Sequence, residues 1–215
     1  MTPTMFAIAL FAGLVSALIT GVVLRVSLRR QLVDVPNARS SHTVPTPSMG
    51  GIGLAVVVIG GKGTHLGASQ YLADVLGRED GAPPPVDLAA ERRNGDLVRQ
   101  LIGGARVTGV HDISSGGIGV ALAEMAMTGG IGATVKLEGA AHAALFGEDQ
   151  GRYVVTLAAN KLDALLADAA DQGIPADHIG ATGGKDLTVE GILTISIAKL
   201  KEAHENWFPD YMAAS

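Results

Sequence analysis

Hydrophobic and polar positions divide the chain into two unlike parts. Residues 5–24 form an apolar run without a charged side chain, and Arg25, Arg29 and Arg30 follow at once. A run of about 20 such residues is long enough to cross a bilayer as one helix. Arginines after the run place that side in the cytoplasm and the N-terminus outside. We therefore expect residues 1–31 to be a transmembrane helix with a basic flank, anchored in the inner membrane.

Two other interpretations of the apolar run remain open. A signal peptide needs basic residues before the run and a small-residue cleavage site after it, whereas the basic residues here come after it. A buried core helix is the second alternative, and the arginine cluster argues against it. The membrane helix is the interpretation that the charge pattern favours.

From residue 55 the pattern is that of an α/β domain. Short β-branched runs at 56–60 and 152–159 predict buried strands, and residues 178–197 suggest three more short strands before a last helix from about Ile197. Three segments have helical apolar spacing: Leu97, Val98, Leu101 and Ile102; Ile118, Ala121, Leu122 and Met125; and Leu162, Leu165, Leu166 and Ala169. Asp87 is a suitable N-cap for the first of these helices. This alternation predicts a helix-covered mixed sheet over residues 55–215.

Charge and cysteine content exclude some functions. The 215 residues carry a formal net charge of -5 and no cysteine. A mildly acidic chain offers no electrostatic support for binding nucleic acid, so we expect no such partner. Disulfides and thiolate metal sites are ruled out.

The strongest local pattern is a polar glycine turn between an expected strand and an expected helix. The strand ends at His111 and Asp112, and the turn contains Ser114, Ser115, Gly116 and Gly117. A helix start after such a turn offers free amides and a positive dipole to an anion. Asp112 is a candidate carboxylate for Mg²⁺, and its alternative role is to order the turn. Capping and proximity to a phosphate are equally supported by the pattern.

A second glycine-rich segment follows the strand at 56–60. It contains Gly67 and Ser69, which are further candidates to lie near a nucleotide phosphate. The segment lacks a GxGxxG pattern, so packing of a tight turn is the more ordinary explanation.

Residues 32–54 form a loop that prolines at 36, 45 and 47 keep out of regular structure. The loop resembles the first cytoplasmic loop of the polyprenyl-phosphate sugar-1-phosphate transferases, which are multi-span membrane enzymes. The matching residues are Asp34, Pro36, Asn37, Arg39, Ser40, Ser41, His42, Pro45, Pro47, Gly50 and Gly51. Ser48 and Met49 depart from that family, and its later helices and acidic motifs do not follow.

Five blocks of the remaining sequence resemble the C-terminal domain of phosphoribosylformylglycinamidine synthase in its short, separate-subunit form. They occupy residues 61–88, 91–102, 110–133, 151–158 and 206–212, in the order of that family. The resemblance implies an α+β layered mixed sheet, like the C-terminal domain of aminoimidazole-ribotide synthetase. We expect a change from one coding segment to another near residues 54–59, whether natural, engineered or an error of sequence assembly.

The resemblance also implies a reaction and its partners. The whole enzyme uses ATP and Mg²⁺ to activate the amide oxygen of formylglycinamide ribonucleotide, and ammonia from a glutaminase subunit then displaces the phosphate. Its partners are the N-terminal domains of the synthase, the glutaminase subunit and a small accessory subunit. The family's catalytic residues lie upstream of the matching region, so none is carried over to this chain. Ser115 stands where relatives have an acidic residue, which weakens any metal contact at the turn.

Three hypotheses about function result. The first is a part of an ATP-dependent amidine synthase, in the cytoplasm and inactive alone. The second is a fragment of a membrane-bound undecaprenyl-phosphate sugar-1-phosphate transferase, and the third is a non-catalytic module anchored to the membrane through residues 5–24. The matching region is about three times longer for the first hypothesis than for the second, which favours the first.

Overall fold

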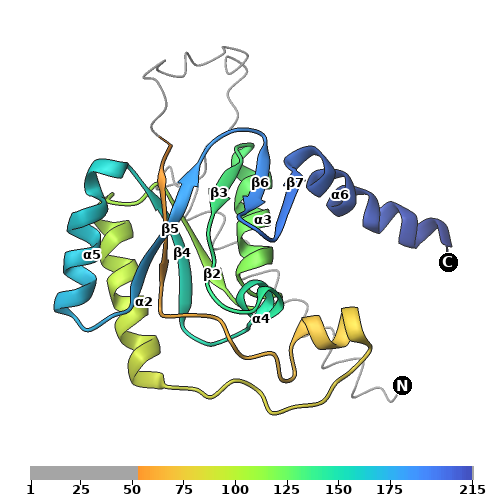
Figure 1. Ribbon diagram of the computed structural model, residues 1–215, viewed down its shortest axis with the longest axis horizontal. Helices are drawn as coiled ribbons and strands as arrows, with labels where there is room; N and C mark the ends of the chain where they lie inside the picture. Colours follow the sequence, from red (N-terminus) through yellow and green to blue (C-terminus); the bar gives the residue numbers. More distant parts are fainter. Residues whose placement is uncertain (1–52, 215) are drawn as a thin grey trace, which may run out of the picture. The chain divides into compact units, whose positions relative to one another are not determined.

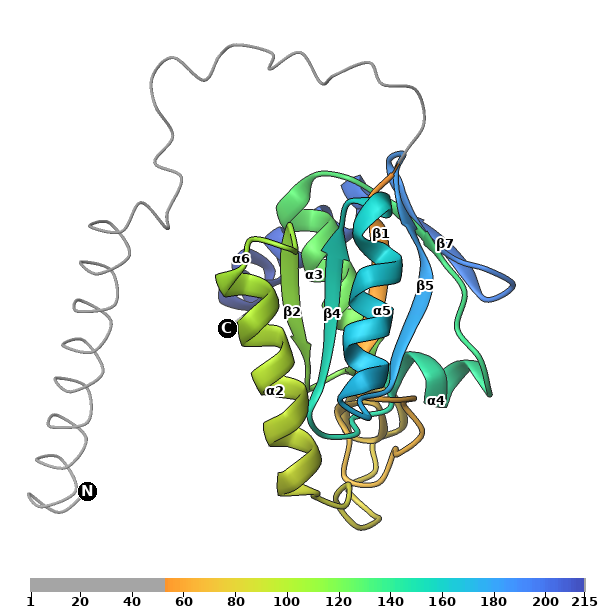
Figure 2. The same cartoon turned by 90° about the vertical axis from the view of Figure 1, so that its left-hand side faces the viewer.

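The computed structural model describes residues 53–214, which form one mixed β-sheet with helices on both faces (Figures 1 and 2). The strand order is β2-β4-β1-β5-β3-β6-β7. The strands are β1 (Ala55–Ile59), β2 (Gly109–Ile113), β3 (Ala133–Val135), β4 (Arg152–Leu157), β5 (Ala176–Thr182), β6 (Asp186–Val189) and β7 (Leu193–Ser196). Only β3 and β6 pair in parallel among these neighbours, so the expected mixed sheet is confirmed.

The helices follow the order expected from the sequence. They are α2 (Leu88–Gly103), α3 (Gly117–Gly129), α4 (Ala141–Phe146), α5 (Leu162–Asp171) and α6 (Ile197–Ala214). A π-helical turn, η1 (Tyr71–Val75), precedes α2, and a 3₁₀ turn, η2 (Ala159–Lys161), precedes α5. In both views α2 and α5 cover one face of the sheet, while α3 and α4 lie on the other.

Strand β1 is the centre of the fold because it is buried on both faces. Ala55, Val57 and Ile59 pack into the core beneath α2 and α5. Val56 and Val58 belong to the core beneath α3. A strand that is covered on both sides needs continuous apolar residues rather than alternation, and the sequence Ala-Val-Val-Val-Ile supplies them.

Helix α2 shows where the predicted apolar face was right and where it was too wide. The Asp87 carboxylate caps the helix by accepting from the Ala89 and Ala90 amides, each at 3.0 Å. Leu97 and Leu101 are buried against the sheet, but Ile102 is 54% exposed. Ile102 was wrongly assigned to the face, because 100° of rotation per residue carries it out of the contact that Leu101 makes.

The other two predicted faces are confirmed. In α3, Ile118, Ala121 and Leu122 are buried, and Met125 packs against the same core. In α5, Leu165 and Ala169 are buried beside the partly buried Leu162 and Leu166. The last helix begins at Ile197, as expected, and continues through Pro209.

The expected membrane helix at 5–24 and the transferase-like loop lie outside the described residues, except for the loop's last two positions. Within residues 53–214, none of the helices combines the length and apolar character that a bilayer-spanning helix requires. The membrane helix stays a prediction about the first part of the chain.

Adjacent side chains on α2 provide a test of the core. We expect Leu101→Ala to lower the free energy of unfolding by about 2–5 kcal/mol, because it opens a cavity under α2. Ile102→Ala removes a similar volume from the surface and should change it by no more than about 0.5 kcal/mol. Urea unfolding followed by circular dichroism measures both variants, and equal losses would contradict the packing described.

Candidate functional site

The two glycine-rich segments singled out in the sequence meet at one carboxylate, that of Glu148. Its Oε1 atom accepts hydrogen bonds from the Gly116 amide at 2.7 Å and from the Gln70 amide at 2.9 Å. Gly116 directly precedes α3, so a negative side chain lies where the positive end of the helix dipole favours an anion. The helix start that was expected to attract a phosphate is thus bonded to a carboxylate of the same chain.

Asp149 does the same for the segment that follows β1. Its Oδ2 atom accepts from the Thr64 amide at 2.7 Å and the His65 amide at 2.9 Å, and its Oδ1 atom accepts from the Thr64 hydroxyl at 3.2 Å. Burial disfavours the charged carboxylate, but the two amide hydrogen bonds and the charge of Arg152 outweigh it. The pKa of Asp149 is therefore held below its ordinary value.

Gly67 and Ser69, the two candidates in the segment after β1, make contacts within the fold. A side chain at Gly67 would bring its Cβ to 2.3 Å from the Ala82 carbonyl oxygen, so only glycine fits there. Ser69 is buried, and its hydroxyl accepts from the Leu72 amide at 3.3 Å at the start of η1. Both residues have structural roles in the turn, and their proximity to a phosphate stays a prediction.

The turn before α3, Ser114 to Gly117, is also held by hydrogen bonds within the fold. Ser114 and Ser115 are exposed, while Gly116 and Gly117 are buried. The Gly117 amide donates to the Ser114 carbonyl at 3.0 Å, and Glu148 holds the Gly116 amide. An incoming phosphate would have to displace Glu148 from this turn.

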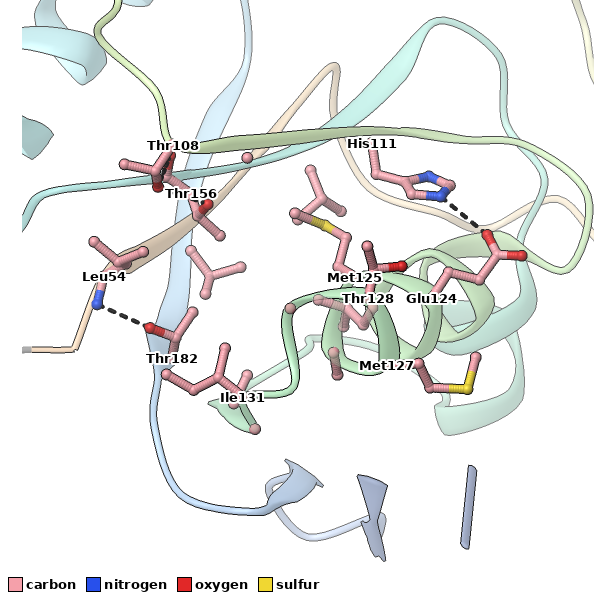
Figure 3. A pocket seen from close by; sticks show the side chains of 18 of the residues that line it. Leu54, Thr108, His111, Glu124, Met125, Met127, Thr128, Ile131, Thr156 and Thr182 are labelled. Carbon is pink, nitrogen blue, oxygen red and sulfur yellow. Dashed lines mark hydrogen bonds and ion pairs between the residues drawn. The ribbon is translucent and has the colours of Figure 1, made fainter. Parts of the chain in front are cut away.

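His111 and Asp112 are neighbours in sequence and line different cavities, although Nδ1 of His111 lies 3.8 Å from Oδ1 of Asp112. The His111 side chain points toward α3, where its Nε2 atom is 2.9 Å from Oε2 of Glu124 (Figure 3). Its Nδ1 atom is 2.6 Å from the Asp112 carbonyl oxygen. Both ring nitrogens have partners within the fold, so His111 links β2 to α3.

Asp112 lines a shallow cleft on the α2 side of the sheet, together with Arg92 and Arg99. Within the described part of the chain, no three histidine, cysteine or acidic side chains come together in a way that would hold a metal ion. Mg²⁺ binding by Asp112 stays a prediction without a supporting ligand group.

A cavity of about 810 Å³ lies between α3 and the sheet (Figure 3). Its wall is mainly apolar, with Val56, Leu122, Met125 and Ile131 among the lining residues. The polar contacts around it are internal: besides the His111–Glu124 pair, the Thr108 hydroxyl lies 3.0 Å from that of Thr156, and the Leu54 amide donates to the Thr182 hydroxyl at 2.9 Å. Lys201, His204 and Glu205 of α6 also line the cavity.

Sequence reasoning missed Glu148, Asp149 and Arg152, the residues that join these segments. No local signal marked them, because Glu148 and Asp149 lie in the loop between helix 141–146 and the strand that begins at Arg152, and the amides that they hold are 32 to 85 residues away in the chain.

Comparison with known proteins identifies the family of this domain. Residues 51–192 match the family model "AIR synthase related protein, C-terminal domain". The chain belongs to this family, which confirms the resemblance drawn from the five sequence blocks.

Among curated proteins, the chain is similar to the subunit PurL of phosphoribosylformylglycinamidine synthase. It is 53% identical to the protein of Parvibaculum lavamentivorans over 192 residues, which cover 80% of this chain and 26% of the relative. It is 50% identical to the Methylocella silvestris protein over 203 residues, covering 85% of this chain and 28% of the relative. The chain thus spans about a quarter of the length of the curated relatives it matches.

Solved structures share the fold. The structure titled "T. maritima PurL complexed with FGAR" has a TM-score of 0.57 and 19% identity, covering 70% of this chain and 28% of that one. The structure titled "T. maritima PurL complexed with ATP" has a TM-score of 0.55 and 18% identity, covering 70% and 26%. These likenesses support the sheet topology described above.

The shifted carboxyl of Asp149 makes stability depend on pH. Its pKa is lower in the folded than in the unfolded state, so its contribution is present above about pH 4 and is lost as the pH falls through the folded-state value. We expect Asp149→Asn to be less stable than the wild type at neutral pH, and the difference to shrink below about pH 4. Urea midpoints at several pH values measure this.

Asp171→Asn, at an exposed position near the end of α5, is the matched control for loss of one negative charge. It should leave the midpoint nearly unchanged at every pH. A difference between Asp149→Asn and wild type that stays constant down to pH 2 would contradict the proposed role of the carboxylate.

Proposed function

We propose that this chain supplies the C-terminal domain of a phosphoribosylformylglycinamidine synthase and does not carry out the reaction alone. The observation that carries the proposal is the match of residues 51–192 to the family, together with about half-identity to PurL subunits four times longer than the matched region. The substrate would be formylglycinamide ribonucleotide, and the product its amidine in purine biosynthesis.

The geometry of the described residues supports a non-catalytic part in that reaction. Transfer of a phosphoryl group from ATP needs donors and Mg²⁺ around the phosphates. Here the amides at the start of α3 and after β1 donate to Glu148 and Asp149 instead. These residues do not fit a nucleotide phosphate while both carboxylates remain in place, so no reaction step is assigned to them.

The partners follow from the same proposal. The other domains of the synthase would bind this one, and the glutaminase and small accessory subunits would complete the enzyme. A solved assembly titled "Structure of PurLQS from Thermotoga maritima" contains a protein with the same fold. The apolar wall of the cavity beside α3 is a surface that a neighbouring domain would cover.

An activity assay tests the proposal. We expect the purified full-length chain, given ATP, Mg²⁺, ammonia and formylglycinamide ribonucleotide, to form no amidine. Adding the separately expressed upstream domains of the Parvibaculum lavamentivorans subunit should restore turnover, because those domains would hold the reacting groups. The intact Parvibaculum subunit is the positive control. Turnover by the chain alone, or none after adding those domains, would count against the proposal.

We also propose that residues 5–24 anchor the chain in the inner membrane with the domain in the cytoplasm. The charge pattern after the apolar run supports this orientation. After high-speed centrifugation of a cell lysate, the full-length chain with an intact N-terminus should sediment with membranes and resist extraction by salt. Recovery in the supernatant would contradict the anchor and would also remove the support for a membrane transferase fragment.

A further inference from the structure

A second, smaller cavity of about 200 Å³ lies on the α3 side of the sheet, where the segment after β1 passes the start of α3. Its floor is apolar and includes Val58, Ile118 and Ala144. Arg152, the first residue of β4, also lines it. The lining of this cavity therefore combines apolar side chains with the guanidinium group of Arg152.

Arg152 is 3% exposed, which is unusual for a permanent charge. Its Nε atom donates to the Gly61 carbonyl at 3.1 Å, and its Nη1 atom donates to the Gly147 carbonyl at 3.2 Å. Among residues 53–214, no carboxylate oxygen lies close enough to form an ion pair with it; Asp149 acts only at longer range. A buried charge without a contacting counter-charge is costly.

The remaining donors of Arg152 face the cavity. A guanidinium has five N–H groups, and the two carbonyls use two of them. In the described part of the chain, every side-chain nitrogen or oxygen that is sealed from solvent has a partner, whereas Nη2 of Arg152 has none. Nη2 therefore keeps some access to open space. Arg152 lines both this cavity and the cleft on the α2 side of the sheet, but alternation along β4 places its side chain on the same face as Val154, which packs in the core beneath α3 and so on the side of this cavity.

Gly63 keeps this space open. A Cβ at Gly63 would lie 2.6 Å from Nη1 and 3.2 Å from Nη2, so any other residue would press on the guanidinium. Lys62 pairs with Glu138 at 2.5 Å, and Lys136 and Asp177 also line the cavity, so these four side chains contribute equal numbers of positive and negative charges. Arg152 adds one further positive charge to the lining, with Asp149 as its longer-range counter-charge outside the lining.

We propose that this cavity binds a small organic monoanion, a short-chain carboxylate, with its carboxylate on Arg152 and its apolar chain on Val58, Ile118 and Ala144. Arginine binds a carboxylate through parallel N–H donors, and a water-poor setting strengthens the contact. The volume exceeds that of a few water molecules, at about 30 Å³ each, and suits a four-carbon acid. This site is separate from the turn held by Glu148 and from the cavity beside α3.

Butyrate is the probe, and butyramide is its neutral counterpart of the same shape. The full-length chain in mild detergent is titrated with each compound, and with inorganic phosphate, at constant ionic strength while the melting temperature is recorded. We expect a saturable rise with butyrate and none with butyramide or phosphate. A missing rise with butyrate, an equal rise with butyramide, or a rise with phosphate alone would overturn the proposal.

Two variants locate the site. Ala144→Leu fills the floor of the cavity and should abolish the butyrate response. Lys136→Glu places a negative charge on the exposed rim, where folding tolerates it, and should weaken the response; Lys185→Glu makes the same change at an exposed position outside the lining and should not. If Lys136→Glu and Lys185→Glu respond to butyrate as the wild type does, the site is not at Arg152.

Discussion

Hydrogen bonds from backbone amides to Glu148 and Asp149 are the interaction on which the loops after β1 and before α3 depend. The two carboxylates collect the amides of Thr64, His65, Gln70 and Gly116, which belong to two segments that are about 50 residues apart in the chain. A carboxylate accepts charge-assisted hydrogen bonds, which are stronger than neutral ones, and each of the two accepts from two amides. Arg152 adds to the arrangement by donating to the Gly61 and Gly147 carbonyls.

The central position of β1 complements this polar cluster. Its side chains divide between two cores, one beneath α2 and α5 and the other beneath α3. Every helix layer therefore packs against the same five residues. The polar cluster lies just beyond the end of this strand, where the Gly60 amide donates to the Pro175 carbonyl and regular pairing stops.

Much of the fold was predictable because its signals are local. The order of strands and helices, the Asp87 cap and the apolar faces of α3 and α5 depend on residues close in sequence, whose periodicity shows in the chain itself. The error at Ile102 came from the edge of an apolar helix face, where neighbouring positions differ between contact with the core and exposure to solvent.

The candidate site was harder to predict from the sequence than the fold. The glycine-rich segments that contain Gly116 and Gln70 were recognised as turns, but Glu148, which both amides contact, is 32 residues from the first and 78 from the second, and no local pattern specifies that contact. The separation of His111 from Asp112 follows from strand alternation and could have been foreseen.

The position of β1 also determines when the domain can close during synthesis. Ala55 pairs with Leu157 in β4 and with Ala181 in β5, so the earliest strand acquires its neighbours only after most of the domain has left the ribosome. Contacts so distant in sequence make folding slow. Whatever precedes residue 53 is synthesised before that closure and meets its own surroundings, lipid or water, while the α/β domain is still an open chain. The sheet therefore closes late in synthesis, once β4 and β5 are available to pair with β1.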